Sequence, residues 1–341
     1  MRTTAETERP AVDRKFRILS LDGGGIKGAF TAAALALLEE RTGRRAVDHF
    51  DLITGTSTGG ILAIGLGLGF SATELMNFYI EAGPTIFPST GITSRLGWFR
   101  QLFGPKHSHA VLRQALVEIL GNRRFGDSRC RLAIPTYDAI KGRIYIMKTC
   151  HHPDLDFAIS DAAAVDVALA TSAAPTFFEA ATFPSQMGAD YVDGGVWANC
   201  PAMVGVAEAI AFLGRTPADI DVLSIGTTST PFSIAAKRKA GAAGWSAGIL
   251  QLMFQAQVEA ARAQSKLIAG GFHRIDASVV AGEFTLDRAH PDTIRKLVVH
   301  GRGEAAKKEN LRVVETRFLD GNLAEPYEDY SVSRVAEEAR R

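Results

Sequence analysis

Apolar and polar positions along the chain alternate between two patterns. Short apolar runs bounded by glycine, proline or charged residues are typical of buried strands, and longer stretches with apolar residues three or four positions apart are typical of helices. The runs predict strands at residues 17–21, 51–54, 130–137, 143–148, 191–192, 221–225 and 272–275. The longer stretches predict helices at 27–41, 58–67, 72–82, 110–120, 160–172, 201–213, 248–268 and 291–309.

This alternation of strand and helix predicts an α/β fold, a three-layer α/β/α sandwich with a largely parallel central sheet. The chain has 341 residues, 46% of them apolar, which suits a single domain at 16–318. The polar ends, 1–15 and 319–341, are expected to be loosely held tails. Residues 52–73 carry no charge and are long enough to span a bilayer, but their six glycines favour a buried strand followed by a helix.

The stretch Gly55-Thr56-Ser57-Thr58-Gly59 lies between an expected strand and an expected helix. This is the G-x-S-x-G pattern of a nucleophile elbow, a sharp turn that holds a serine hydroxyl out at the end of a sheet. Glycines suit the flanking positions because strand and helix cross too closely for a Cβ. The alternative is an ordinary glycine-rich turn whose serine caps the helix.

A second glycine-rich turn, Asp22-Gly23-Gly24-Gly25-Ile26-Lys27-Gly28, also follows a strand and precedes a helix. Its bare N–H groups and the helix start favour an anion. A dinucleotide fingerprint fits, with Asp48 or Asp51 near the place of a ribose ligand. A Walker loop does not fit, because Gly28 stands where Ser or Thr is required. An oxyanion hole is the third interpretation, and the serine elbow one strand–helix unit later favours it.

A third turn, Asp193-Gly194-Gly195, places a carboxylate at the end of an expected strand. Asp-Gly-Gly is common in ordinary turns and is not diagnostic alone. Together the three turns supply a hydroxyl nucleophile, an anion-binding nest and a carboxylate base. None of the eight histidines lies in a turn that pairs obviously with Ser57.

These three motifs, in this order and spacing, resemble the signatures of patatin-like phospholipases. Residues 170–178, Ala-Thr-Ser-Ala-Ala-Pro-Thr-Phe-Phe, resemble a fourth stretch that the family carries before its catalytic aspartate, and the likeness runs over 17–318. The resemblance implies a Ser57–Asp193 dyad. It also implies an oxyanion hole and supporting glycines at the following positions: Gly23, Gly24 and Gly25 for the hole, and Gly28, Gly55, Gly59, Gly194 and Gly195 for the turns. Cys200 stands where the family usually has asparagine, which we expect to alter packing and not chemistry.

The resemblance implies a lipid acyl hydrolase of the phospholipase A type that acts on membrane phospholipid, contacts membranes peripherally and needs no metal or other cofactor. Chains of this kind also resemble bacterial anti-phage effectors switched on by a cyclic nucleotide, so a cyclic dinucleotide activator is a further hypothesis. Two alternatives stay open: a dinucleotide-binding oxidoreductase built on the glycine turn, and a storage or scaffold protein of the same fold with residual esterase activity.

Composition adds a little. The net charge of +1 gives no reason to expect a nucleic-acid polymer as partner, and three widely spaced cysteines suit a reduced, cytoplasmic protein. Oligomeric state is not indicated. Two segments, 83–108 and 235–270, combine aromatic and basic residues and are candidates to govern access to the site. The alternative for each is ordinary structure, an ordered loop and a plain core helix.

Overall fold

The computed structural model describes residues 14–87, 108–155, 157–175, 177–183, 189–230, 242–280 and 282–331, with the backbone alone for 242–251. Its strands form one sheet in the order β5-β6-β3-β2-β1-β7-β8, with β4 paired to β3. The strands are β1 (Phe16–Leu21), β2 (Leu52–Gly55), β3 (Arg131–Asp138), β4 (Arg143–Lys148), β5 (Ala181–Thr182), β6 (Asp190–Asp193), β7 (Ile220–Ile225) and β8 (Gly271–Ile275).

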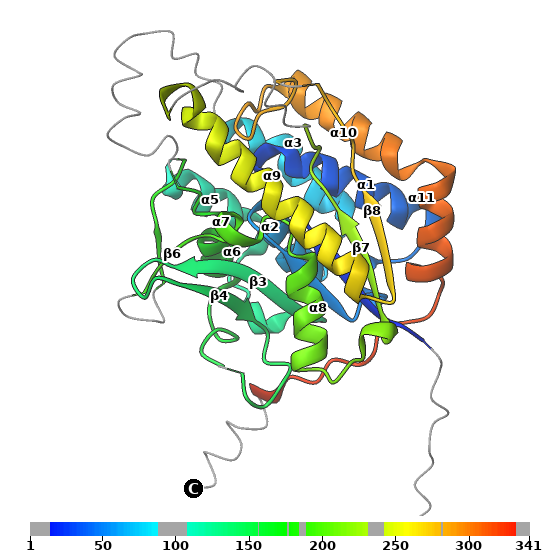
Figure 1. Cartoon of the computed structure of the whole chain (residues 1–341). Helices are drawn as coiled ribbons and strands as arrows, with labels where there is room; N and C mark the ends of the chain where they lie inside the picture. The colour runs from blue at the N-terminus through cyan, green and yellow to red at the C-terminus, as the bar shows by residue number, and fades with distance from the viewer. Residues whose placement is uncertain are drawn as a thin grey trace, which may run out of the picture.

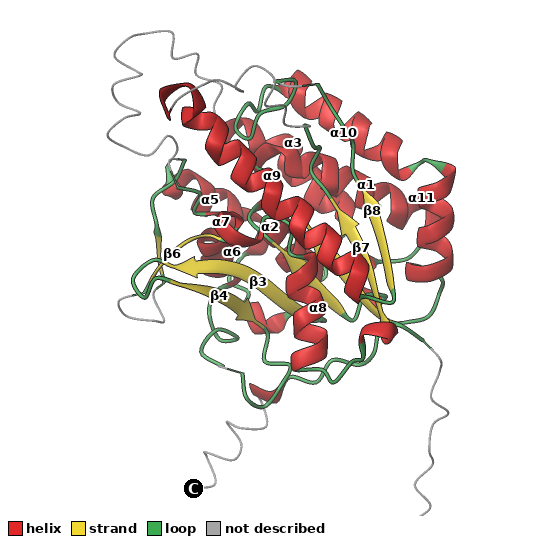
Figure 2. Cartoon of the chain, viewed as in Figure 1, coloured by secondary structure: helices red, strands yellow, loops and turns green. Residues whose placement is uncertain are grey.

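Helices cover both faces of this sheet, which gives the three layers that the sequence predicts (Figure 1, Figure 2). They are α1 (Gly28–Thr42), α2 (Thr58–Gly67), α3 (Ala72–Ile86), α5 (His109–Leu120), α6 (Ala164–Ser172), α7 (Gly195–Ala198), α8 (Ala202–Ala211), α9 (Ala242–Ile268), α10 (Pro291–Ala305) and α11 (Lys308–Val313). The last of these runs into a π-helical turn, Val314–Phe318.

Side chains alternate between two apolar cores along β1. Ile18 packs with β7 and α8 on one face, and Leu19 and Leu21 pack on the other face with α1 and α2. The whole strand is buried, as expected of a central parallel strand covered on both sides. Four of its six residues are apolar, and the other two, Arg17 and Ser20, are buried as well.

The parallel character of the sheet is confined to β3, β2, β1, β7 and β8. The other described pairings, β3 with β4, β3 with β6 and β5 with β6, are antiparallel. β4 follows β3 by a short turn, Ala139–Gly142, which only an antiparallel pair allows. The sheet is therefore mixed, with a parallel centre that carries the glycine turn and the serine elbow.

Several predicted boundaries shift. The helix expected at 160–172 begins at Ala164, and the one expected at 291–309 ends at Ala305 and is followed by a separate helix. The helix expected at 72–82 continues to Ile86, so the start of the proposed access segment 83–108 belongs to α3. Residues 88–107 of that segment, and 231–241 ahead of α9, lie outside the described residues.

The prediction of a loosely held C-terminal tail is wrong for residues 319–331. Leu319 is buried, Asp320 forms an ion pair with Arg17, and the Glu325 N–H donates to Asp51 at 2.6 Å. The Tyr330 N–H donates to the Cys150 carbonyl. A polar, non-periodic segment is held here by hydrogen bonds to buried charges of the sheet, which hydropathy does not report. Residues 332–341 and 1–13 lie outside the described residues.

Residues 52–73 form β2, α2 and the start of α3, as the sequence predicts. No described helix combines the length and the apolar character needed to cross a bilayer.

Candidate active site

Ser57 lies at the turn between β2 and α2, in the elbow that the sequence predicts. Its backbone has φ 54° and ψ −123°, a conformation that L-residues rarely adopt. A Cβ at Gly55 would overlap with the Gly59 carbonyl, and one at Gly59 with the Leu21 carbonyl of β1. Glycine is required at these two positions because strand and helix are in direct backbone contact.

Thr171, at the end of α6, fixes the elbow from the side. Its hydroxyl accepts a hydrogen bond from the Ser57 N–H at 3.1 Å and donates to the Pro135 carbonyl of β3 at 2.7 Å. Two residues later, the Ala173 carbonyl accepts the Asp193 N–H at 2.9 Å. The fourth motif, 170–178, therefore connects the elbow and the aspartate through the backbone. Sequence reasoning noted this stretch but gave Thr171 no role.

The register of β3 brings Asp193 to Ser57. β4 pairs with β3 along Ala133–Asp138, so β2 and β6 must share the opposite edge. β2 runs parallel to β3 and pairs up to Ala133, while β6 runs antiparallel and ends with Asp193 opposite Thr136. The carboxyl ends of the two strands thus meet head-on beside Pro135. Proline suits this gap in the ladder because it has no N–H to satisfy.

Asp193 is a buried carboxylate with neutral donors. It is 5% exposed, and it accepts hydrogen bonds from the Ser57 hydroxyl and, at 2.7 Å, from the Gly195 N–H. Burial raises the pKa of this carboxyl to about 6, and the two hydrogen bonds oppose the shift. A carboxylate with a pKa near neutrality is well matched to general base catalysis.

The glycine turn lies beside the elbow. A Cβ on Gly23 would come within 3.3 Å of the Ser57 Cβ. The Gly23 N–H, however, donates to the Asn199 carbonyl at 2.9 Å, and the Gly23 carbonyl accepts from the Thr227 hydroxyl at 3.1 Å. Within the described residues, the N–H groups of Gly24 and Gly25 have no hydrogen-bond partner. The predicted oxyanion hole therefore narrows from three amides to two.

The aspartates of the dinucleotide interpretation lie at the wrong end of the sheet. Asp51 precedes β2 and accepts hydrogen bonds from Arg14 and the Arg17 N–H, and Asp48 pairs with Arg129. The glycine turn follows β1, at the carboxyl end of the same parallel strands. A dinucleotide bound at the glycine turn could not reach either carboxylate.

Cys200, the departure from the expected motif, is buried near Ser224 and not beside the dyad. Its Sγ lies 3.9 Å from the Ser224 hydroxyl, and burial raises the pKa of the thiol to about 12. A thiol held neutral in this way is a packing group. The described histidines with buried rings are also occupied elsewhere: His49 contacts the Asn322 carbonyl, and His151 contacts Glu208 at 3.0 Å.

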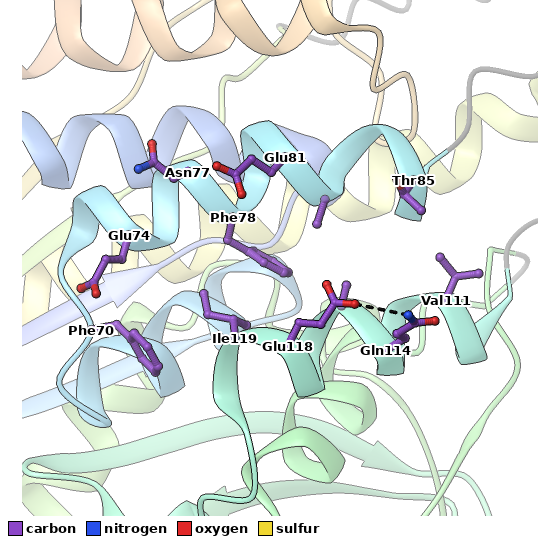
Figure 3. Close-up of a pocket in the computed structure, with 12 residues that line it drawn as sticks. Phe70, Glu74, Asn77, Phe78, Glu81, Thr85, Val111, Gln114, Glu118 and Ile119 are labelled. Carbon is purple, nitrogen blue, oxygen red and sulfur yellow. Dashed lines mark hydrogen bonds between the residues drawn. The ribbon is translucent and has the colours of Figure 1, made fainter.

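A separate hollow of about 630 Å³ lies between α3 and α5 (Figure 3). Its floor is apolar, with Phe78 and Ile119, and its rim carries Glu74, Glu81 and Glu118. Among the residues that the structure describes, no lysine or arginine lines it. The negative charge of these glutamates would repel a phosphate-bearing ligand. Within the described ranges, no cluster of His, Cys, Asp or Glu side chains is arranged to hold a metal ion.

Comparison with known proteins gives a consistent result. The family model of patatin-like phospholipases matches residues 19–206, which contain all three motifs. A "cGAMP-activated phospholipase" of Vibrio cholerae is 33% identical over 86% of this chain and 91% of its own length. A protein of the same name from Pseudomonas aeruginosa is 37% identical over 71% of this chain and 72% of its own. "Patatin-like protein 1" of Arabidopsis thaliana is 33% identical over 65% and 61% respectively.

Proposed function

This chain belongs to the patatin-like phospholipase family, and on that premise we propose that it hydrolyses fatty acyl esters of membrane phospholipids with Ser57 as nucleophile and Asp193 as base. The single observation that carries the proposal is the meeting of the carboxyl ends of β2 and β6 beside Pro135, which brings a serine on a strained elbow to a buried aspartate. Burial raises the pKa of that aspartate to about 6, which supports its role as the base. The family premise excludes the oxidoreductase alternative.

In the proposed reaction, Ser57 Oγ attacks the ester carbonyl carbon while its proton passes to Asp193. The carbonyl oxygen becomes an anion, and the free N–H groups of Gly24 and Gly25 would donate to it. Asp193 then returns the proton to the leaving alcohol, which leaves an acyl-enzyme. A water molecule gives its proton to Asp193 and attacks this ester. Asp193 then passes that proton to the departing Ser57 Oγ, which releases the fatty acid and restores the serine hydroxyl.

We extend the proposal to peripheral membrane contact through α9. Met253 and Phe254 on this helix are 57% and 41% exposed. About one turn further on, Gln257 accepts the Asn199 N–H and donates to the Val196 carbonyl, next to the glycine turn and Asp193. Exposed apolar side chains beside the site would place its entrance at the lipid surface.

A cyclic dinucleotide activator is the finer part of the proposal. Relatives named for activation by cGAMP support it, because one of them matches this chain over 86% of its length. A role in defence against phage would follow. The acidic hollow between α3 and α5 does not suit this ligand, since three glutamates would face its two phosphates.

The test is fatty-acid release from mixed phospholipid vesicles, with and without cGAMP, with Ser57→Ala as the control. We expect wild-type release to rise on addition of cGAMP and the mutant to release none. Release that is complete without nucleotide and unchanged by it would contradict the activator and leave the hydrolase. If a fluorophosphonate probe also fails to label Ser57 in the presence of cGAMP, the storage or scaffold alternative takes its place.

Sedimentation with the same vesicles tests the proposed membrane-binding surface on α9. Met253→Asp should lower vesicle binding several-fold, because it places a charge where an apolar side chain meets lipid. Leu267→Asp is the matched control: Leu267 is 85% exposed on the same helix, about 21 Å further along it. Equal loss of binding in the two variants, or no loss in either, would contradict this surface.

A further inference from the structure

A buried group of charges lies beneath the glycine turn, outside the residues of the proposed dyad. Arg274 of β8 forms ion pairs with Asp22 at 2.6 Å and with Asp276 at 2.8 Å. The three side chains are 9%, 4% and 12% exposed. Arg274 also donates to the Ser224 hydroxyl at 2.7 Å. Asp22 is the first residue of the glycine turn, so Arg274 contacts the turn at the point where it leaves β1.

Asp276, the second carboxylate of this group, holds the loop that packs against the glycine turn. Asp276 accepts the N–H groups of Thr228, at 3.1 Å, and Ala277, at 3.0 Å. Thr228 has φ 79°, a strained conformation for a β-branched residue. Its neighbour Thr227 donates to the Gly23 carbonyl, and a Cβ on Gly24 would overlap with the Thr227 side chain. Asp276 therefore fixes the position of residues 227–228, and Thr227 in this loop contacts both Gly23 and Gly24.

The register of the sheet makes this bridge available. Leu21, Ile225 and Ile275 are direct partners across β1, β7 and β8, so the three loops leave the sheet at one level. Gly226 follows β7 between the other two, and a Cβ there would come within 2.5 Å of Arg274 Nη2. The glycine thus leaves space for the guanidinium to reach from β8 to β1.

Charge balance also depends on Arg274. Burial raises the pKa of Asp22, and Arg274 opposes that shift, which favours the ionised carboxylate. Lys27 is a second cation near the two carboxylates, and its Nζ donates to the Thr228 carbonyl. Without Arg274, two buried negative charges would stand close to the place where the proposed reaction creates a third.

We propose that Arg274 is a positioning residue for the oxyanion hole: its guanidinium, by bridging Asp22 and Asp276, holds the Gly24 and Gly25 N–H groups where they meet the developing anion. This inference rests on the proposed function. It also goes beyond the matched family segment, 19–206, because Arg274 lies outside it. A planar fork with several donors makes this bridge, and a lysine ammonium does not reproduce it.

The decisive variant is Arg274→Lys, assayed on a soluble short-chain ester under conditions in which the wild type is active. It keeps the charge and loses the bridge. We expect kcat to fall about tenfold or more with KM unchanged, because only the transition state carries the oxyanion. Labelling of Ser57 by a fluorophosphonate should slow by a similar factor. That fall is smaller than the roughly 10²–10³-fold cost of removing one oxyanion donor.

Arg317→Lys is the matched control. Arg317 contacts both oxygens of Asp221, at 2.7 and 3.2 Å, at the other end of β7. It should lower thermal stability without changing kcat, which is what a purely structural arginine would do. If Arg274→Lys does not unfold cooperatively, Ser224→Ala decides: it removes one donor contact of Arg274 and should lower kcat a few-fold.

The outcomes separate cleanly. Wild-type kcat in a folded Arg274→Lys, or in Ser224→Ala where that variant decides, overturns the positioning role and leaves the proposed function intact. A rise in KM at constant kcat also overturns it, since that result would place Arg274 in substrate binding. Wild-type protein that is inert toward the ester, and toward the fluorophosphonate with cGAMP present, overturns the proposed function and this inference with it.

Discussion

The two ends of the parallel strands carry similar buried charges in different settings. At the amino end, Asp51 accepts from both Nη atoms of Arg14 and from the N–H groups of Arg17 and Glu325. At the carboxyl end, Asp193 accepts from one hydroxyl and one N–H, with no cation among these donors. Asp51 is thus paired with a cation and surrounded by hydrogen-bond donors, whereas Asp193 is buried beside two neutral donors.

The backbone differs in the same way. Within the described residues, the non-glycine residues with positive φ are Ser57 and Thr228, and both follow the carboxyl ends of strands. The unpaired N–H groups of Gly24 and Gly25 lie there too. The amino end has the features of an element that stabilises the fold. The carboxyl end holds strain and incomplete hydrogen bonding, which a fold tolerates where chemistry requires them.

Replacing each of these two carboxylates by its amide is the strongest test of the difference between the two ends. Asp193→Asn should reduce hydrolysis by about 10³-fold or more, because the serine loses its base. Asp51→Asn should leave kcat unchanged and destabilise the protein by about 3–5 kcal/mol, the usual cost of breaking a buried ion pair. Initial rates on a soluble ester and urea unfolding measure the two effects. Loss of kcat in a fully stable Asp51→Asn would contradict the division between the two ends.

The stability of Asp193→Asn should have a characteristic pH dependence. The folded pKa of Asp193, about 6, lies above the ordinary value of 3.8, so its favourable contribution is complete below pH 4 and lost as pH rises through 6. Asparagine does not titrate, so the variant should be more stable than wild type above pH 6, by up to about 3 kcal/mol, and the difference should close below pH 4. Wild-type kcat/KM should fall below pH 6 for the same reason. A stability difference independent of pH would contradict the raised pKa.

The sequence predicts those parts of the site whose cause is local. Gly55 and Gly59 are required by a strand–helix crossing within five residues, so the elbow is visible as a motif. The contact between Arg274 and Asp22 spans 252 positions and depends on the order of β1, β7 and β8. The capture of the Gly23 N–H by Asn199 is of the same kind, and no local pattern predicts either.

Substituting one glycine at each of two places, Gly24 and Gly43, tests the role of the glycine turn itself. The expected loss of kcat is smaller than that of Asp193→Asn. Gly24→Ala places a methyl group within 2.6 Å of the Thr227 Cβ, so the turn must shift and its free N–H must move. We expect kcat to fall by about 10²–10³-fold, the cost of one oxyanion donor. Gly43→Ala is the control: Gly43 ends α1 with φ 65° and has no atom within 4 Å of the added Cβ. It should cost about 1 kcal/mol of stability and leave kcat unchanged.

A second substitution shows whether the effect of Gly24→Ala is steric. Thr227→Ala removes the side chain that the new methyl group would meet, and it also removes the hydroxyl that holds the Gly23 carbonyl. If displacement of the turn causes the loss, the double variant should recover part of the kcat that Gly24→Ala loses, although Thr227→Ala alone lowers it. Strict additivity of the two losses would mean that Gly24 acts other than through its place beside Thr227. The confinement of the glycine turn by its neighbours, on which the contrast between the two ends depends, would then be wrong.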